Sequence, residues 1–252
     1  MDPVVVARII RETAEAEILP RFGHLTAGQI REKKPGQLVT EADVEAEKVL
    51  SRRLVDLVPG SLVVGEEAVD GDPALLRNLE GLGTVWVIDP VDGTGNFAKA
   101  NSRFAVIIAL VVGGITRAGW IHDPVADRMV MAEAGEGAWL GSRRLSVLPD
   151  GPLDSLNGSV KRSGRLAAMV ARVGRQGSAA HDYIDLVTGV LHFAHFKRLM
   201  PWDHAAGVLI HTEAGGFSQL LDGRAYQPVA CEAALLLTPT EGCWRSLKPL
   251  VE

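Results

Sequence analysis

The strongest constraint on the fold is the tract Trp86–Thr94, in which an apolar run leads directly into two carboxylates. Asp89 and Asp92 lie three residues apart. A run this apolar is typical of a buried strand, so we expect the strand to end where the two acids begin. Pro90 would fix the turn, and Gly93 would let a backbone amide approach a ligand closely. Two carboxylates held side by side repel each other unless they share a cation, so the tract predicts a metal site.

The composition is that of a globular, core-forming protein. The chain has 252 residues, of which 47% are hydrophobic and 5% aromatic, and this length allows one large domain or two small, closely packed ones. The net charge of −5 argues against a nucleic-acid partner that is bound through its phosphate backbone.

Three features bear on location. Cys231 and Cys243 have no metal-ligand companions, so neither a disulfide framework nor a zinc site is expected, and a reducing cytoplasm fits best. The N-terminus has the spacing of an amphipathic helix and not of a signal peptide. The longest apolar run, 104–115, is too short to cross a bilayer, so we expect no membrane span.

The first part of the chain reads as helix, loop, helix and strand. A first helix is expected to end near Pro20, and a loop rich in Lys, Gly and Pro covers 31–37. Thr40 and Asp43 match a capping box for a helix that stops at Pro59. A short strand, 61–64, then ends at two further acids, and 70–83 reads as a charged linker or short helix.

The second part reads as an antiparallel meander followed by alternating strands and helices. The apolar stretches of the meander are 104–112, 116–121, 128–132 and 137–140. After these we expect a strand at 155–160, helices near 165–171 and 179–188, a strand near 190–196 and a helix at 202–214.

Taken singly, most of the candidate site residues have an ordinary structural explanation. Asp43 fits a helix-capping acid, Glu66 fits a solvated strand end, and Asp203 fits an acid that complements a helix dipole. Asp89 and Asp92 differ, because they follow a buried strand, and for them a ligand role is favoured on local grounds alone.

Three other motifs are rejected. Gly135-Glu136-Gly137 lies between strands of the meander, so it indicates a hairpin turn and not a dinucleotide site. The seven histidines do not show zincin spacing. A haloacid dehalogenase-type nucleophile would lie two residues before Asp92, where the chain has Pro90.

In combination, the four acids Glu66, Asp89, Asp92 and Asp203 supply oxygen ligands only, which suits Mg²⁺ better than zinc or copper. Five segments of the chain match those of a known family, and each contains at least one acid. In chain order they are 38–43, 65–67, 86–97, 201–207 and 213–216. In these segments, and along nearly its whole length, the chain resembles the inositol monophosphatase family of magnesium-dependent, lithium-sensitive phosphatases.

The resemblance implies a layered α/β/α/β/α sandwich, of mixed α/β (α+β) class. It forms one unit over 1–252, with an α+β half at 1–140 that carries most of the metal ligands and a smaller α/β half at 141–252. The active site would lie between the halves. Family members are commonly homodimers, and the substrate is a small phosphorylated metabolite.

The resemblance also implies a cofactor of two or three Mg²⁺ ions and a role for each site residue. One ion would be held by Glu66, Asp89 and the backbone carbonyl of Val91, and a second by Asp89, Asp92 and Asp203. Thr94, hydrogen-bonded to Asp43, would orient the attacking water, with Glu66 helping to deprotonate it. The predicted substrate contacts are Asp92, Gly93, Thr94, Gly95, Ala179 and Lys197.

The substrate remains open between several phosphate esters. Inositol-specific members have a Glu at the position of Phe196, so a hydroxyl acceptor is replaced here, and the cations Lys197 and Arg198 follow it. These cations favour a substrate with a second anionic group. We expect hydrolysis of a small polyol or sugar phosphate. The alternatives are histidinol phosphate, fructose 1,6-bisphosphate or a nucleotide 3′-phosphate, or a transcription-associated binding role of the extragenic-suppressor type.

Overall fold

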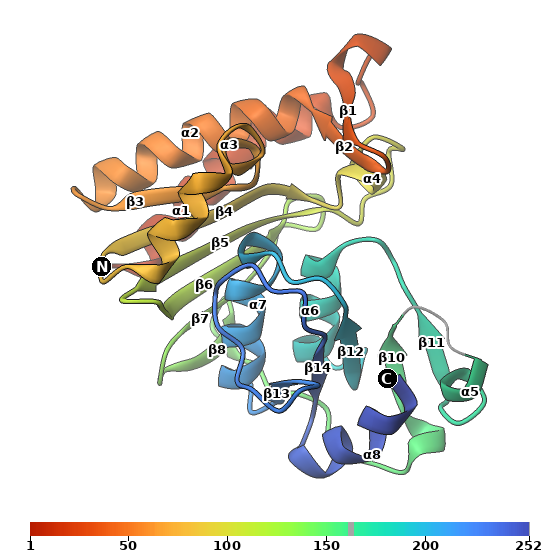
Figure 1. The fold of residues 1–252 in the computed structure, drawn as a ribbon. Coiled ribbons are helices and arrows are strands. Elements are labelled where there is room, and N and C mark those ends of the chain that lie inside the picture. The colour runs from red at the N-terminus through yellow and green to blue at the C-terminus, as the bar shows by residue number, and fades with distance from the viewer. Residues whose placement is uncertain (161–163, 252) are drawn as a thin grey trace.

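The computed structural model describes residues 1–160 and 164–251, and its helices and sheets alternate in layers (Figure 1). The helices are α1 (Pro3–Thr13), α2 (Glu41–Leu57), α3 (Glu66–Gly71), α4 (Thr94–Phe97), α5 (Gly164–Ala167), α6 (Ala179–Thr188), α7 (Pro201–Glu213) and α8 (Glu241–Val251). Shorter helical turns are η1 (Ala14–Ile18), η2 (Leu19–Arg21), η3 (Ala27–Gln29), η4 (Pro73–Glu80) and η5 (Leu153–Ser155).

The larger sheet has seven strands in sequential order. They are β3 (Leu62–Gly65), β4 (Thr84–Asp92), β5 (Ala105–Val112), β6 (Ile115–Asp123), β7 (Arg128–Glu133), β8 (Gly137–Leu140) and β9 (Arg143–Arg144). Only the β3–β4 pair is parallel, so the expected antiparallel meander is confirmed. The turn at 134–136 joins β7 to β8, which confirms the hairpin.

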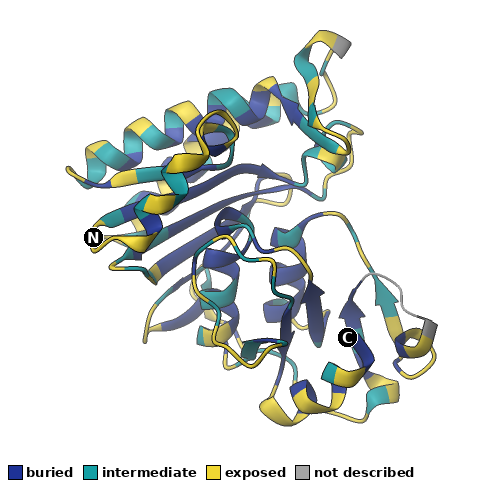
Figure 2. Ribbon diagram, in the orientation of Figure 1, coloured by how far each residue is buried: buried dark blue, intermediate teal, exposed yellow. Residues whose placement is uncertain are grey.

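Both faces of this sheet are covered, because alternate residues of its central strands point to opposite sides. Trp86 and Ile88 of β4 pack in one core with α1 and α2, whereas Val85 and Val87 pack in a second core with α6 and α7. The central strands are accordingly buried along nearly their whole length (Figure 2).

The smaller sheet has five strands and covers the other side of α6 and α7. Its order is β11 (Arg172–Gly174), β10 (Asn157–Ser159), β12 (Phe193–Phe196), β14 (Leu235–Thr238) and β13 (Phe217–Leu220). Ala194 and Phe196 share the core with α6 and α7, whereas Phe193 packs in a third core with α8. The layers therefore run α/β/α/β/α, which confirms the expected fold class.

Two sequence predictions about local structure are wrong. The predicted loop at 31–37 is a hairpin, because β1 (Ile30–Lys34) pairs with β2 (Gln37–Thr40) across a turn at Pro35-Gly36, where Gly36 has a positive φ of 79°. The strand that carries Asp89 does not end before the acids, since β4 continues through Asp92.

Other boundaries differ by a few residues. The first helix is followed by the π-helical turn η1 and the 3₁₀ turn η2, so helical structure reaches Arg21. The segment expected as a charged linker or short helix holds the end of α3 and the turn η4. The expected helix near 165–171 is only one turn long, and the strand near 190–196 starts at Phe193. Within the described part of the chain, no helix combines the length and apolarity that a bilayer crossing requires.

Candidate active site

A β-bulge in β4 places Asp89 and Asp92 on the same side of the sheet. In a regular strand, residues three apart point to opposite faces. Here Asp89 pairs with Ile107 and Asp92 with Ala105, so three steps along β4 match only two along β5. The extra residue restores the common direction of the two carboxylates. Pro90 is tolerated there because a bulge leaves one residue out of the hydrogen-bond ladder.

Asp203, in the first turn of α7, completes a cluster of three carboxylates. One oxygen of each of Asp89, Asp92 and Asp203 lies within 4.8 Å of the others. Burial raises the pKa of Asp89 well above its ordinary value, and the charges of Glu66, Asp92 and Asp203 add to the rise. Burial likewise raises the pKa of Asp203. The negative charge of these buried carboxylates is not balanced within the cluster, and their oxygens are hard ligands. The cluster therefore fits a divalent cation such as Mg²⁺.

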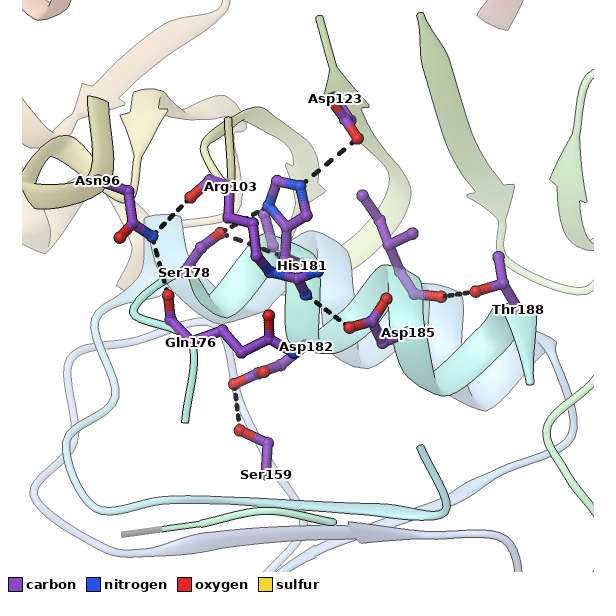
Figure 3. A network of polar contacts seen from close by, with 12 residues as sticks. Asn96, Arg103, Asp123, Ser159, Gln176, Ser178, His181, Asp182, Asp185 and Thr188 are labelled. Carbon is purple, nitrogen blue, oxygen red and sulfur yellow. Dashed lines mark hydrogen bonds and ion pairs between the residues drawn. The ribbon is translucent and has the colours of Figure 1, made fainter. Parts of the chain in front are cut away.

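One oxygen of Asp92 is fixed by hydrogen bonds, which leaves its other oxygen for the cluster. Asp92 Oδ2 accepts from Ser178 Oγ at 2.5 Å and from the Ala180 amide at 2.8 Å. The single proton of Ser178 is used in this bond, so His181 Nδ1, 3.1 Å away, is the donor towards Ser178. His181 Nε2 lies 3.4 Å from Asp123 on β6 (Figure 3).

Asp43 and Thr94 meet as the resemblance implies. Thr94 Oγ1 lies 3.1 Å from Asp43 Oδ1 and 3.0 Å from the carbonyl oxygen of Val91, so one hydroxyl is held between two acceptors. Asp43 Oδ2 also accepts from the amide and hydroxyl of Thr40, which confirms the capping box. Asp43 therefore caps α2 and holds Thr94 at once. Burial raises the pKa of Asp43 to about 6, against the lowering effect of the Thr40 hydrogen bonds.

Glu66 lies beside the three-carboxylate cluster, but its carboxylate contacts a lysine. Lys33 Nζ, from the β1–β2 hairpin, is 3.1 Å from Glu66 Oε1 and 2.8 Å from Glu67 Oε1. Burial raises the pKa of Glu66 to about 7, and the charge of Lys33 opposes the rise. Sequence analysis missed Lys33 because its segment was interpreted as a loop.

A second buried acid was also missed. The carboxylate of Glu47 accepts hydrogen bonds from the amides of Glu67 and Ala68, both at 2.8 Å, and so fixes the start of α3. A Cβ atom on Gly65 would lie 2.4 Å from this carboxylate, so a larger residue there would displace the Glu47 carboxylate from the two amides. The signal in the sequence was the helical spacing of Glu47, which lies three residues before the buried Leu50 and so on the same side of α2.

Two cavities extend from the cluster, and Asp203, Arg175 and Arg198 line both. The first, of about 420 Å³, lies towards Lys33 and Glu66. The second, of about 230 Å³, lies towards Asp92 and is called the inner cavity below. Its walls include Gly177, Ser178, Ala179 and Phe196.

The other predicted substrate contacts fall in different places. Gly93 lies at the start of α4 with a positive φ of 89°, and Gly95 is in the first turn of that helix. Lys197 is exposed and lines neither of these two cavities, whereas its neighbour Arg198 lines both.

Comparisons with known proteins agree with this geometry. Residues 4–249 match the model of the inositol monophosphatase family. The chain is 33% identical over 205 residues to an inositol-1-monophosphatase of Bacillus subtilis, which covers 76% of each chain. It is 30% identical to a fructose-1,6-bisphosphatase/inositol-1-monophosphatase of Thermotoga maritima, over 82% of this chain and 84% of the relative. A solved Thermotoga maritima IMPase structure superposes with a TM-score of 0.84 at 25% identity, covering 100% of this chain and 97% of the other.

Proposed function

The chain belongs to the inositol monophosphatase family and is a phosphoric monoester hydrolase, and from this premise we propose that it hydrolyses a small polyol or sugar phosphate with Mg²⁺ as cofactor. The observation that carries the proposal is the meeting of Asp89, Asp92 and Asp203 within 4.8 Å, on elements more than a hundred residues apart in sequence.

The ligand set assigned to the cofactor consists of oxygen atoms only. Asp89, Asp92 and Asp203 would hold two or three Mg²⁺ ions together with Glu66 and the carbonyl oxygen of Val91. When bound, Mg²⁺ lowers the pKa of water and stabilises negative charge on the leaving oxygen. The same ions reverse the local negative field, which would otherwise repel a phosphate ester.

The chain's own residues orient the nucleophile. The hydroxyl of Thr94, held by Asp43 and the Val91 carbonyl, would position a water for attack on phosphorus, and Glu66 would accept its proton. The water oxygen forms a bond to phosphorus while the bond from phosphorus to the ester oxygen breaks. The products are inorganic phosphate and an alcohol, with a proton from solvent on the leaving oxygen.

The rest of the substrate would occupy the inner cavity. Ala179 and Asp92 line it, and Gly93, Thr94, Gly95 and Lys197 remain predicted contacts. A reducing, cytoplasmic location remains the expectation from the cysteine pattern of the sequence. A homodimer remains the expected assembly.

Asp89→Asn tests the proposal. With Mg²⁺ present, we expect the wild type to release phosphate from inositol 1-phosphate and the variant to lose at least about a thousandfold in kcat, because the central oxygen ligand becomes a neutral amide. Asp56→Asn, on an exposed position of α2, is the matched control and should be unaffected. Normal hydrolysis by Asp89→Asn would show that the assignment is wrong.

A further inference from the structure

Most of the polar side chains that line the inner cavity already have partners. Ser178 donates to Asp92, and the two ring nitrogens of His204 lie 3.0 Å from Tyr183 Oη and 3.2 Å from the carbonyl oxygen of Arg198. Such groups have little capacity left to bind a substrate.

Asp182 is only partly engaged. One of its oxygens accepts from Ser159 at 2.7 Å, while Oδ1 is buried without a hydrogen-bond partner (Figure 3). This oxygen is the one acceptor with spare capacity that we find among the described side chains of the cavity outside the carboxylate cluster.

Two exposed guanidinium groups line the same wall. Their charges favour the ionised forms of the acids beside them, since Arg175 opposes the rise in the pKa of Asp182 and Arg198 opposes that of Asp203. Among the described residues, neither Arg175 nor Arg198 has an ion pair or a side-chain hydrogen bond, although both lie near a carboxylate cluster. Arg175 comes from the segment between β11 and α6, and Arg198 from the segment between β12 and α7. Each also lines the larger cavity, so the pair lies where the two cavities meet at Asp203.

Arg198 lines the inner cavity, whereas its cationic neighbour Lys197 does not. Phe196 and Arg198, two residues apart, both line the inner cavity. Lys197 alternates with them, and its charge acts instead on His195. Phe196 offers no hydrogen-bonding group, because its side chain is a hydrocarbon. Its ring is buried and stacked on Tyr183 with centroids 5.6 Å apart. The free binding capacity of this wall is therefore mainly cationic.

We propose that Arg175 and Arg198 form a second anion subsite, so that the preferred substrate is a phosphate monoester that carries a further phosphate or carboxylate group. The inference rests on the proposed function, since the reacting phosphate is taken to bind at the carboxylate cluster. Guanidinium groups bind phosphate and carboxylate through paired, charge-assisted hydrogen bonds. A substrate with its reacting phosphate at Asp92 and Asp203 extends into the cavities that these two arginines line.

Matched substrate pairs test the subsite. The kcat/KM of the wild type is measured with Mg²⁺ for fructose 1,6-bisphosphate against fructose 1-phosphate, and for 3-phosphoglycerate against glycerol 3-phosphate. We expect a preference of at least about tenfold for the substrate with a second anionic group in one of the pairs, and the pair that shows it distinguishes phosphate from carboxylate. Arg198→Ala and Arg175→Ala should each raise KM for that substrate about tenfold more than they raise KM for the singly phosphorylated ester of the same pair.

Arg117→Ala is the control, because it removes an exposed guanidinium at the far end of β6 and should change none of these values. Lys197→Ala tests the competing contact, and we expect a smaller effect from it than from Arg198→Ala.

The outcomes separate the two proposals. If the wild type hydrolyses no phosphate ester with Mg²⁺, the proposed function fails. If it hydrolyses esters without preferring a second anionic group, the anion subsite alone is refuted. An equal loss of kcat on both members of a pair would also refute it, because the arginines would then act on the reacting phosphate.

Discussion

At the scale of single residues, the site depends on how a few side chains are fixed. Asp92 is the clearest case, because Ser178 and the Ala180 amide hold one of its oxygens and His181 holds Ser178 in turn. His181 is a positioning residue in this scheme, since it contacts neither the cluster nor the cavities described above.

His181→Leu should therefore weaken Mg²⁺ binding. Residues that orient a metal ligand through hydrogen bonds typically contribute about ten- to a hundredfold in metal affinity. We therefore expect the Mg²⁺ concentration for half-maximal activity to rise by about that factor. At saturating Mg²⁺ most of kcat should return. His24→Leu, at an exposed position, is the control. An unchanged Mg²⁺ dependence in His181→Leu would rule out the positioning role.

The glycine after the acids provides a second prediction at this scale. Gly93 has a φ of 89°, and a Cβ atom there would lie 2.8 Å from the Arg103 carbonyl oxygen. Gly93→Ala should lower the free energy of unfolding by about 2 kcal/mol or more, as measured by urea denaturation. At Gly95 no atom lies within 4 Å, so Gly95→Ala should be neutral or slightly stabilising. Equal effects of the two substitutions would contradict this explanation.

The sequence indicated which acids meet in the candidate site, but not the geometry that brings them together. The tract from Trp86 to Thr94 indicated a metal site because buried apolar residues and adjacent acids rarely occur together for another reason. The bulge was not predictable, since a shift of register depends on the partner strand β5. Lys33 was missed because its pairing with Glu66 joins two segments that are separate in sequence.

At the scale of elements, α7 links the site to the core. It presents Asp203 in its first turn, and its later residues pack between the two sheets. His211, near its end, is fully buried with Nδ1 2.9 Å from Ser218 Oγ. Burial alone lowers the pKa of His211 to about 3.

This histidine makes stability depend on pH. Its folded pKa is below the unfolded value of about 6.5, so the unfolded state binds the proton more tightly and stability falls as the pH drops below about 6.5. The loss for one such group is about 1.4 kcal/mol per pH unit down to the folded pKa. Urea denaturation between pH 7 and pH 5 gives the slope of the free energy of unfolding against pH. We expect this slope to be smaller in His211→Gln than in the wild type, by the contribution of about one proton bound on unfolding. The same slope in both proteins would contradict the assignment, and His24→Gln, which is exposed, serves as control.

The hairpin of β1 and β2 shows why element prediction failed in places. Lys33 and Lys34 gave the segment a loop-like composition, yet the strands pair across Pro35-Gly36. The meander was predicted correctly because its apolar stretches are separated by turn signals that depend only on local sequence.

At the scale of the whole molecule, the site lies where the first sheet meets the helices of the second half. β4 contributes Asp89 and Asp92, and α7 contributes Asp203. Because α6 and α7 share one core with the seven-stranded sheet, we propose that 1–140 and 141–252 form one folding unit.

A truncated chain of residues 1–140 should therefore fail to fold by itself. Removing α6 and α7 would expose Val85, Val87, Ile107 and Ile121 of the large sheet to water. The full chain should unfold in one transition by circular dichroism and by tryptophan fluorescence. Two separate transitions, or a folded 1–140 fragment, would show that the halves are independent.

The most direct test of the account is calorimetric titration of Mg²⁺ into the metal-free protein, because the central claim is that acids from β4 and α7 hold the cation jointly. We predict binding to the wild type and to Asp56→Asn, and affinity at least about a hundredfold weaker in Asp89→Asn and in Asp203→Asn. A wild type that binds no Mg²⁺, or variants that bind it as tightly as the wild type, would contradict the account.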